Sequence, residues 1–449
     1  MNRYTALLFS HPELLHEKFS QTDLGQLYLS IPFEQLASTI PPPPHSVSGL
    51  GCKPWLDVKG GIALQILKHY LQLSDASLME RINTDWAMQM FCGIQLKSGE
   101  RIRDKNLPSF WRCYLGKQMD VGKMQKEFAD FWKPYMQETS ISKQDATCYE
   151  SRIAHPTDIK LLWECCETEY GWMQEERRKL RLRKSRSNFG RQRKAFLLYQ
   201  RNRKKTKRAE KKLRKRLLKY LLRLMELMNE LVEKYDLKLS KKKIRKIKTL
   251  HKIYEQQHQR AYGNADEPIK DRIVSLSKPY IRPIVRGKEA KSVEFGAKVN
   301  KLMVDGIGFM EHISFDAFNE TTRFDSAIYL HRQLFGKCTH HSADRIYATN
   351  KNRKYATSQN IFTNFIPKGK QKAEHSEQAS IMRKLLTTNH TTVLEGSFGN
   401  EKNHYLLNKI NARNQSTEVC WIFFGMMAAN ASIIANRIAE QTQHKARAA

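Results

Sequence analysis

The longest stretch of this chain without proline runs from Thr157 to Glu267 and contains only three glycines. Because proline interrupts helices and glycine weakens them, this composition predicts long helices. Within Arg177 to Tyr220, 22 residues are Lys or Arg and a single residue, Glu210, is acidic. The ordinary explanation of a charged run is a solvated helix face. Positive charges in this run are more closely spaced, and less balanced by acidic residues, than solubility requires. The run therefore predicts contact with phosphate groups.

Two apolar stripes in this stretch predict a helical hairpin. The first has the alternating four- and three-residue spacing of a coiled-coil seam and consists of Leu217, Leu221, Leu224, Met228 and Leu231. The second lies in a return helix around Lys243 to Tyr262 and consists of Ile244, Ile247, Leu250 and Tyr254. We expect the two stripes to pack against each other.

The whole chain is strongly basic. Its 449 residues include 78 Lys or Arg and 45 Asp or Glu, a formal net charge of +33. Such an excess is costly in self-repulsion unless a polyanion neutralises it, which indicates nucleic acid first and an anionic membrane surface second. A hydrophobic fraction of 40% is enough for a real core, and the length allows two to four domains.

Short helices are predicted before the basic stretch. The prolines at 41–44 and the Ser/Gly-rich residues after them form a break. Beyond it, Leu56 to Leu96 reads as consecutive helices, with Ser74 and Asp75 as caps, and Asp104 to Lys117 as a further one. Together they predict a compact, all-helical domain over about 50–135.

Strand patterns lie on both sides of the basic helical stretch. Ser140 to Ser151 has β-branched and aromatic residues without helical periodicity. Ser292 to Met303 and Gly308 to Ser314 flank Asp305-Gly306, a dipeptide typical of tight hairpins. A helix from about Ser326 to Leu334, short strands near Ala343 and at 361–366, and terminal helices follow. We therefore expect a mixed α/β domain that a long helical insertion interrupts after its first strand.

Two features weigh against export and against a membrane span. The apolar patch Ala6 to Phe9 is too short for a signal-peptide core. The apolar run Val419 to Ala435 contains Asn430 and Ser432, and we expect it to be a buried core helix, with Trp421, Phe423, Phe424, Met426 and Met427 in the core. The eight cysteines show no zinc-ligand or disulfide spacing, so reduced thiols in a cytoplasm are expected.

Three acidic residues fall where the predicted sheet would bring them together. Asp145 lies within the first strand, Asp344 at the end of a later strand, and Glu395 at the start of a helix. Carboxylates from separate elements bind hard divalent cations, and a pair of Mg²⁺ ions serves phosphoryl transfer. A single Asp in a strand or loop is far more often a cap or a surface charge, so spacing alone is weak support.

Several sequence blocks resemble those of bacterial insertion-sequence transposases of the DDE class. They are DATCYES from Asp145 with HPTD from His155, VEFGAK from Val293, ADRIY from Ala343 with Asn352-Arg353, and EGSFGNEK from Glu395. Their order matches as well as their letters, and Leu56 to Leu96 is similar to the helical N-terminal domain of that family. The likeness covers about residues 50 to 440.

The resemblance implies specific roles. Asp145, Asp344 and Glu395 would be the catalytic, metal-binding acids of an RNase H-like core that uses two Mg²⁺ ions, for which Mn²⁺ substitutes. Lys402, two helical turns after Glu395, would hold a DNA phosphate. One departure is Thr391, where many relatives have arginine four residues before the glutamate; the nearest arginine is Arg383.

The resemblance also sets the expected function. The chain would be a mobile-element endonuclease and transposase that binds the terminal inverted repeats of its insertion sequence, cleaves DNA at the ends and joins them to target DNA. The reaction implies at least a homodimer on double-stranded DNA, no membrane, and a cytoplasmic, nucleoid-associated bacterial protein. Expected phosphate contacts within the insertion are Arg177, Arg178, Arg181, Arg183, Arg191, Arg193, Lys204 and Lys205.

The expected domains are a helical DNA-binding domain at 1–135, the first part of the catalytic domain at 136–165, the basic insertion at 166–274 and the rest of the catalytic domain at 275–440. Two other functions stay open. One is a non-catalytic basic DNA-binding protein, including an inactive transposase relic, and the other is a membrane-surface or scaffold protein.

Other polar residues are expected to lie in turns or loops or to have no catalytic role. Asp305 is expected in a turn because a glycine follows it. His340 and His341 are expected in an exposed loop. Glu401 competes with Glu395 for the third acidic role but faces a different side of the helix.

Overall fold

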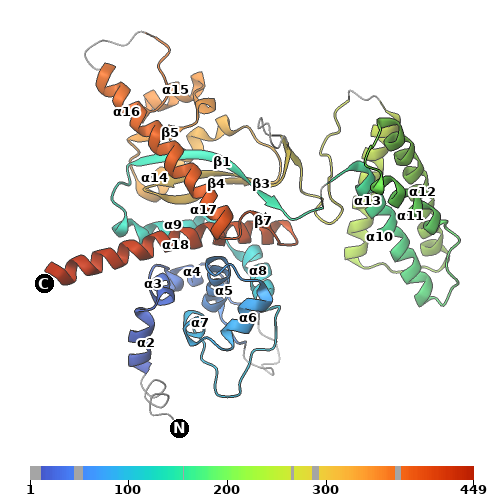
Figure 1. Cartoon of the computed structure of the whole chain (residues 1–449), viewed down its shortest axis with the longest axis horizontal. Helices are drawn as coiled ribbons and strands as arrows, with labels where there is room; N and C mark the ends of the chain where they lie inside the picture. Colours follow the sequence, from blue (N-terminus) through green and yellow to red (C-terminus); the bar gives the residue numbers. More distant parts are fainter. Residues whose placement is uncertain are drawn as a thin grey trace. The chain divides into compact units, whose positions relative to one another are not determined.

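The computed structural model describes residues 12–44, 54–154, 156–263, 267–285, 293–369 and 376–448. The chain divides into two compact units (Figure 1). Unit 1 comprises residues 1–152 and 297–449, and unit 2 comprises residues 153–296. His155 and Cys52 lie outside the described residues, as do parts of the predicted break after Pro44. The mixed α/β class expected from the sequence is confirmed.

Unit 1 is built on a mixed sheet. Its central strand β1 (Ile141–Ser151) runs parallel to β5 (His340–Ala343), which runs parallel to β6 (Phe362–Thr363). On the other side of β1 lies β3 (Val293–Val304), which forms an antiparallel hairpin with β4 (Ile307–Ser314). Asp305 and Gly306, both at positive φ, form the predicted turn of that hairpin. The short strand β7 (Lys409–Ile410) pairs with the end of β1.

The N-terminal part of unit 1 consists of short helices, as the sequence predicts. They are α2 (Pro12–Ser20), α3 (Asp23–Leu29), α4 (Phe33–Ser38), α5 (Val58–Tyr70), α6 (Asp75–Ile82), α7 (Trp86–Phe91), α8 (Leu107–Gln118) and α9 (Val121–Trp132), followed by the 3₁₀ turn η1 (Lys133–Tyr135). Ser74 begins α6 as predicted, since its hydroxyl accepts a hydrogen bond from the Ser77 amide.

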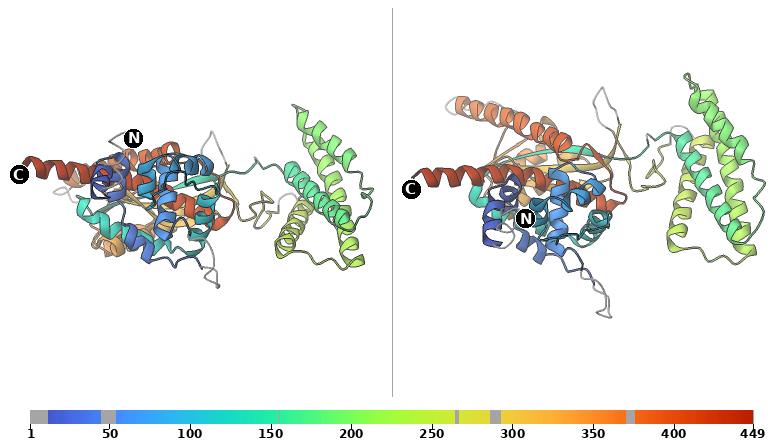
Figure 2. Two further views of the ribbon diagram at one scale, coloured as in Figure 1. Left: turned by 90° about the horizontal axis from the view of Figure 1, so that it is seen from below. Right: turned by 60° about the horizontal axis from the view of Figure 1, so that its bottom comes forward.

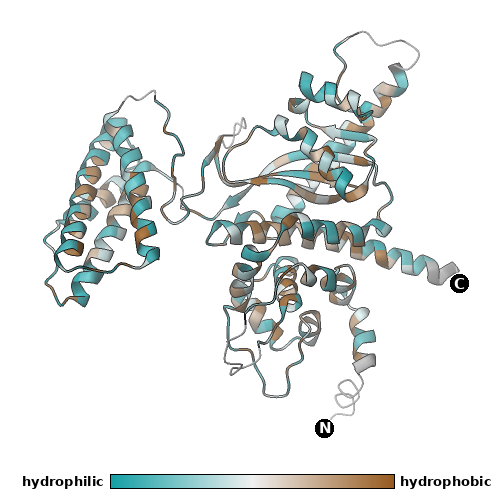
Figure 3. Ribbon diagram, turned by 180° about the vertical axis from the view of Figure 1, so that it is seen from behind, coloured by the Kyte–Doolittle hydropathy of each residue, from teal (hydrophilic) through white to brown (hydrophobic). Residues whose placement is uncertain are grey.

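The C-terminal helix α18 (Gln415–Ala448) is the core helix that the sequence predicts. Phe423, Phe424 and Met427 are completely buried. Figure 3 shows hydrophobic residues along much of this helix and hydrophilic ones toward the C-terminus, and both views in Figure 2 show it as one long helix. By length and composition α18 could cross a membrane, but most of its apolar stretch is buried within unit 1.

Helix α18 joins the N-terminal helices to the sheet, because it packs on α3, α5 and α8 and also on β4. The Asn430 side chain donates to the Gly308 carbonyl over 2.7 Å and accepts from the Gly308 amide over 3.0 Å, so it satisfies backbone groups that an edge strand leaves open. Residues 1–135 therefore share one unit with the sheet, whereas the sequence-based division separates them.

The second half of unit 1 supplies the layers around β5 and β6. It contains η2 (Glu320–Arg323), α14 (Phe324–Phe335), η3 (Arg345–Tyr347) and α15 (Asn350–Ser358). A helix that crosses the sheet follows, made of α16 (Ser376–Asn389), the π-helical turn η5 (His390–Glu395) and α17 (Gly396–His404); η5 contacts β1 and α16 contacts β5 (Figure 1).

Unit 2 is the predicted helical insertion, with α10 (Asp158–Lys179), α11 (Phe189–Arg201), α12 (Lys207–Lys234) and α13 (Lys241–Tyr262) bundled together (Figure 2). The strand β2 (Pro283–Val285) pairs with the first residues of β3. Thr157, Thr206 and Ser240 cap three of the helices through their hydroxyls. Unit 2 therefore extends beyond the predicted boundaries of 166–274.

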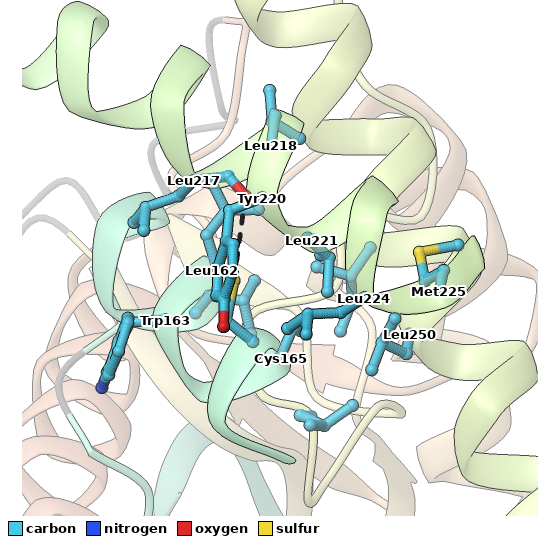
Figure 4. Close-up of a cluster of buried hydrophobic side chains, with 14 of the residues drawn as sticks. Leu162, Trp163, Cys165, Leu217, Leu218, Tyr220, Leu221, Leu224, Met225 and Leu250 are labelled. Carbon is cyan, nitrogen blue, oxygen red and sulfur yellow. Dashed lines mark hydrogen bonds between the residues drawn. The ribbon is translucent and has the colours of Figure 1, made fainter. Parts of the chain in front are cut away.

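The predicted seam of unit 2 is buried, but its main partner differs. Leu217, Leu221 and Leu224 pack against Leu162 and Cys165 of α10, while Leu250 of α13 completes the cluster (Figure 4). The second stripe is partly wrong, because Ile244 is exposed and Ile253, rather than Tyr254, is fully buried. Helix α12 packs against both α10 and α13, so the core of unit 2 contains more helices than the predicted two-helix hairpin.

Candidate functional site

The first two candidate acids occupy neighbouring positions on parallel strands. In the register of β1 and β5, Gln144 pairs with Ala343, the last residue of β5; Asp145 is the next residue of β1, and Asp344 is the first residue after β5. Asp344 immediately precedes the 3₁₀ turn η3. The pKa of buried Tyr347 is raised by its burial and also by the negative charges of Glu320, Asp145 and Asp344. The topology thus brings two residues that are 199 positions apart in the sequence to neighbouring positions in the sheet.

The third acid, Glu395, reaches this region through the crossing helix. It is the last residue of η5, the π-helical turn that contacts β1. Such turns insert an extra residue into a helix and are frequent at functional sites. His390, the first residue of the same turn, has its Nε2 atom 3.5 Å from Asp344 Oδ1. The turn therefore links the helix that carries Glu395 to the strand end that carries Asp344.

His390 is the most constrained polar group near the acids. Its ring is buried, and neither ring nitrogen forms a hydrogen bond with the described residues. Burial lowers the pKa of His390, and Lys143 lowers it further, although the carboxylates of Asp344 and Glu395 act in the opposite direction. The net effect favours the neutral ring. Sequence reasoning missed this residue, which has no helix-cap or motif pattern.

Lys402 lies on the strand face that carries Asp145. Its Nζ donates a hydrogen bond of 3.0 Å to Thr147 Oγ1 and lies 5.8 Å from the centre of the Tyr149 ring. Side chains at positions two apart on a strand share a face, so Asp145, Thr147 and Tyr149 form one row. An ammonium group beside this row is placed to meet an anion that approaches Asp145.

A buried ion pair contacts the same row of side chains through Tyr149. Lys301 of β3 and Glu401 of α17 pair through Nζ and Oε1, and each side chain is almost fully buried. The Tyr149 hydroxyl also donates to Glu401, and burial together with this carboxylate raises the pKa of Tyr149. Glu401 is therefore a structural residue. A lysine within the apolar strand 299–304 was the one sequence feature that could have indicated the pair.

The three acids have the ligand type that a divalent metal ion prefers, but their side chains lie too far apart to bind one ion together. All three candidate ligands are carboxylates, the ligand that Mg²⁺ prefers, and the Asp344 side chain is 61% exposed. Within the described residues, however, no group of three His, Cys, Asp or Glu side chains is close enough to hold a metal ion. Asp145 and Asp344 could hold an ion from adjacent strands, and Glu395 would have to approach them.

A pocket of about 550 Å³ opens beside Asp344. Its polar lining consists of Asp344, Arg345, Arg353, Asn364, Lys368, Thr387, His390 and Thr391. Arg353 is held by the Ala348 carbonyl over 3.1 Å, and its guanidinium lies 5.5 Å from the Phe365 ring centre. One wall is thus acidic and another is cationic. Such a pocket suits a phosphodiester group next to a carboxylate.

The remaining predicted residues are placed as follows. Thr391 also lines this pocket, and its hydroxyl donates to the Thr387 carbonyl, so it supplies no cation in place of the family's arginine. Arg383 lies in α16. Asp305 is a turn residue and forms an ion pair with Arg437 over 2.8 Å.

The expectation for His340 and His341 was wrong. Both lie in β5, and His341 is completely buried between Ser142 and Gln144, with hydrogen-bond distances of 2.8 and 3.1 Å. Burial lowers the pKa of His341 to about 3. A polar pair on a short central strand can be buried when neighbouring strands supply partners, which spacing along the chain does not reveal.

The predicted phosphate-binding residues of the insertion lie on the surface of unit 2. Exposed positions are Arg178, Arg181, Arg183, Arg191, Arg193, Lys204 and Lys205. Arg177 is half-buried, because its Nε donates to the Arg183 carbonyl over 2.8 Å and closes the loop after α10.

The seven cysteines that the structure describes form no disulfide with one another.

Comparison with known proteins adds no identity. No protein-family model, no curated protein and no solved structure matches the chain.

Proposed function

We propose that this chain is a DDE-class DNA transposase with an RNase H-like core, interrupted by the basic helical insertion. The observation that carries the proposal is the placement of Asp145 on β1 and of Asp344 directly after the parallel strand β5, each one residue beyond the pair Gln144–Ala343, with Glu395 in the turn that contacts β1. Lys402 on the same strand face and the cationic wall beside Asp344 add phosphate-binding groups where a DNA strand would be cut.

In this proposal Asp145, Asp344 and Glu395 would hold two Mg²⁺ ions, which would activate a water or 3′-hydroxyl and stabilise the leaving oxygen. Mn²⁺ would substitute for them. Lys402 would contact a phosphate near the scissile bond, and the buried His390 ring, 3.5 Å from Asp344 Oδ1, would limit how that carboxylate turns. Backbone phosphates of the element ends or of target DNA would be bound by the predicted cations of unit 2, which are Arg177, Arg178, Arg181, Arg183, Arg191, Arg193, Lys204 and Lys205. At least two copies would act together, because two ends are joined in one reaction.

The second candidate is a basic DNA-binding protein without turnover. The exposed basic surface of unit 2 supports it. In either case the place of action is the bacterial cytoplasm, at the nucleoid. The third interpretation, a membrane-surface or scaffold protein that uses the basic helical hairpin, predicts binding to vesicles and no preference for DNA.

Replacement of Asp145 by Asn separates the two candidates. A transposase loses metal-dependent cleavage and strand transfer in this variant and keeps its affinity for DNA. A binding protein has no cleavage to lose, and its affinity is unchanged. DNA binding and cleavage are measured on the same end-labelled duplex in Mg²⁺ and in Mn²⁺.

A further inference from the structure

Unit 2 contains a pocket that three of its helices form together. It has a volume of about 630 Å³ and is lined by Gln192 of α11, by Lys215, Arg216, Lys219 and Tyr220 of α12, and by Tyr262 of α13. The four residues of α12 lie three to five positions apart or adjacent, so they cover one side of that helix. The seam residues Leu217 and Leu221 are buried away from it.

The lining carries three cations and no acid. Within the described residues, no carboxylate lies within ion-pair distance of Lys215, Arg216 or Lys219. Other arginines of the same helix are neutralised: Arg214 pairs with Asp158 and Glu210, and Arg223 pairs with Glu226. Lys215, Arg216 and Lys219 therefore face the pocket without a carboxylate partner among the described residues, unlike Arg214 and Arg223.

Two of these cations are already held in position. Arg216 donates from Nε to Gln192 Oε1 over 2.6 Å and from Nη2 to the Arg191 carbonyl over 3.4 Å. The Lys215 ammonium lies 4.5 Å from the centre of the Tyr262 ring, a cation–π distance. Side chains that are ordered before binding lose less conformational entropy when an anion arrives. An anion that enters this pocket therefore meets cations that already converge on it.

We propose that this pocket binds a phosphate group through Lys215, Arg216 and Lys219. A phosphate offers several acceptor oxygens to cations that converge from one side, and a guanidinium binds it through paired hydrogen bonds. The phosphate comes either from a nucleic-acid backbone or from a free phosphate. This site is independent of the carboxylates of unit 1, so its test does not depend on whether the chain cuts DNA.

The chain contains a matched internal control. Lys207, Arg208 and Lys211 have the same residue types and the same spacing on the same helix, and all three are exposed outside the pocket. The pocket variant is Lys215→Gln/Arg216→Gln/Lys219→Gln, and the control variant is Lys207→Gln/Arg208→Gln/Lys211→Gln. Both remove three positive charges from α12, so general electrostatic attraction falls equally in the two.

The experiment measures binding of the full chain to a DNA duplex across a series of salt concentrations, and to inorganic phosphate by calorimetry. We expect the pocket variant to bind DNA at least about 10-fold more weakly than the control variant. We also expect the slope of log affinity against log salt to fall by about 1 for each backbone phosphate that the pocket variant no longer binds. The control variant should still bind that phosphate.

Each outcome decides the proposal. A selective loss of DNA affinity identifies the backbone as the source of the phosphate. Selective loss of inorganic phosphate binding, with DNA binding equal in the two variants, identifies a free phosphate. Equal behaviour of both variants toward both ligands overturns the proposal. The single variant Lys219→Gln removes one exposed pocket cation without disturbing the Gln192 or Tyr262 interactions, and it should give a partial loss even if the triple variant folds poorly.

Discussion

Lys402 donates a hydrogen bond to Thr147, the residue two positions beyond Asp145 on the same strand face. This hydrogen bond places a cation from the crossing helix beside the first candidate acid. Glu395 and Lys402 are seven residues apart on that helix. Glu395 ends the π-helical turn that contacts β1, and Lys402 contacts β1 through Thr147.

Replacement of Lys402 by Gln should lower DNA cleavage by about 10-fold or more, because the variant lacks a positive charge near the reacting phosphate. Lys384→Gln, which removes an exposed lysine from α16, serves as the matched control and should cleave normally. Cleavage rates are compared at saturating DNA. Equal rates for the two variants would remove Lys402 from the site.

Replacement of His390 by Gln should reduce cleavage by about 10-fold, because a misplaced carboxylate costs rate steeply. The effect should appear in the rate at saturating DNA rather than in DNA affinity, since His390 contacts Asp344 and not solvent-facing cations. His404→Gln, an exposed histidine of α17, is the control. An unchanged rate in His390→Gln would show that Asp344 does not need this support.

The Lys301–Glu401 pair should be costly to break one partner at a time. Lys301→Met leaves the Glu401 carboxylate buried without its cation and should lower the free energy of unfolding by about 3–5 kcal/mol. The double variant Lys301→Met/Glu401→Gln removes both charges and should recover much of this loss. Thermal unfolding of the parent, of Lys301→Met, of Glu401→Gln and of the double variant measures the difference. An additive double variant would mean that the two side chains do not interact.

Glu169 should make unit 2 less stable at higher pH. Burial raises the pKa of this carboxyl from 4.5 to about 7, although Lys243 partly opposes the shift. A raised pKa in the folded state means that the full stability is present below about pH 4.5 and is lost as the pH rises through about 7. Glu169→Gln should therefore raise the free energy of unfolding by about 1–3 kcal/mol at pH 8 and change it little at pH 4.5.

The control for this prediction is Glu167→Gln, an exposed carboxylate two residues earlier in α10. Scanning calorimetry of the full chain at pH 5 and pH 8 gives the comparison. A pH-independent difference between Glu169→Gln and the parent protein would contradict the assignment of the raised pKa.

Local patterns in the sequence predicted much of the fold. Asp305-Gly306 predicted the hairpin, Ser74 predicted the start of α6, and Leu217 to Leu231 predicted a buried seam, because turn chemistry, capping and periodicity act over a few residues. The strands β2 and β7 are three and two residues long and have no periodicity to detect.

Contacts between residues that are far apart in the sequence could not be predicted from such local patterns. Lys301 and Glu401 are 100 residues apart, and His341 is buried because β1 supplies Ser142 and Gln144. The candidate acids were chosen by resemblance, and their adjacency on β1 and β5 became visible only through the strand register. His390 had no pattern at all, since its position beside Asp344 depends on how the helix crosses the sheet.

The most direct test of the transposase proposal is cleavage of a labelled duplex that carries the DNA bordering this gene's own element end. The parent protein, Asp344→Asn and Asp130→Asn are compared with and without Mg²⁺; Asp130 is an exposed carboxylate of α9. The proposal predicts Mg²⁺-dependent cleavage at the end by the parent and by Asp130→Asn, and none by Asp344→Asn, with DNA bound equally by all three. Cleavage that survives in Asp344→Asn, or bound DNA that no protein cuts, would contradict it.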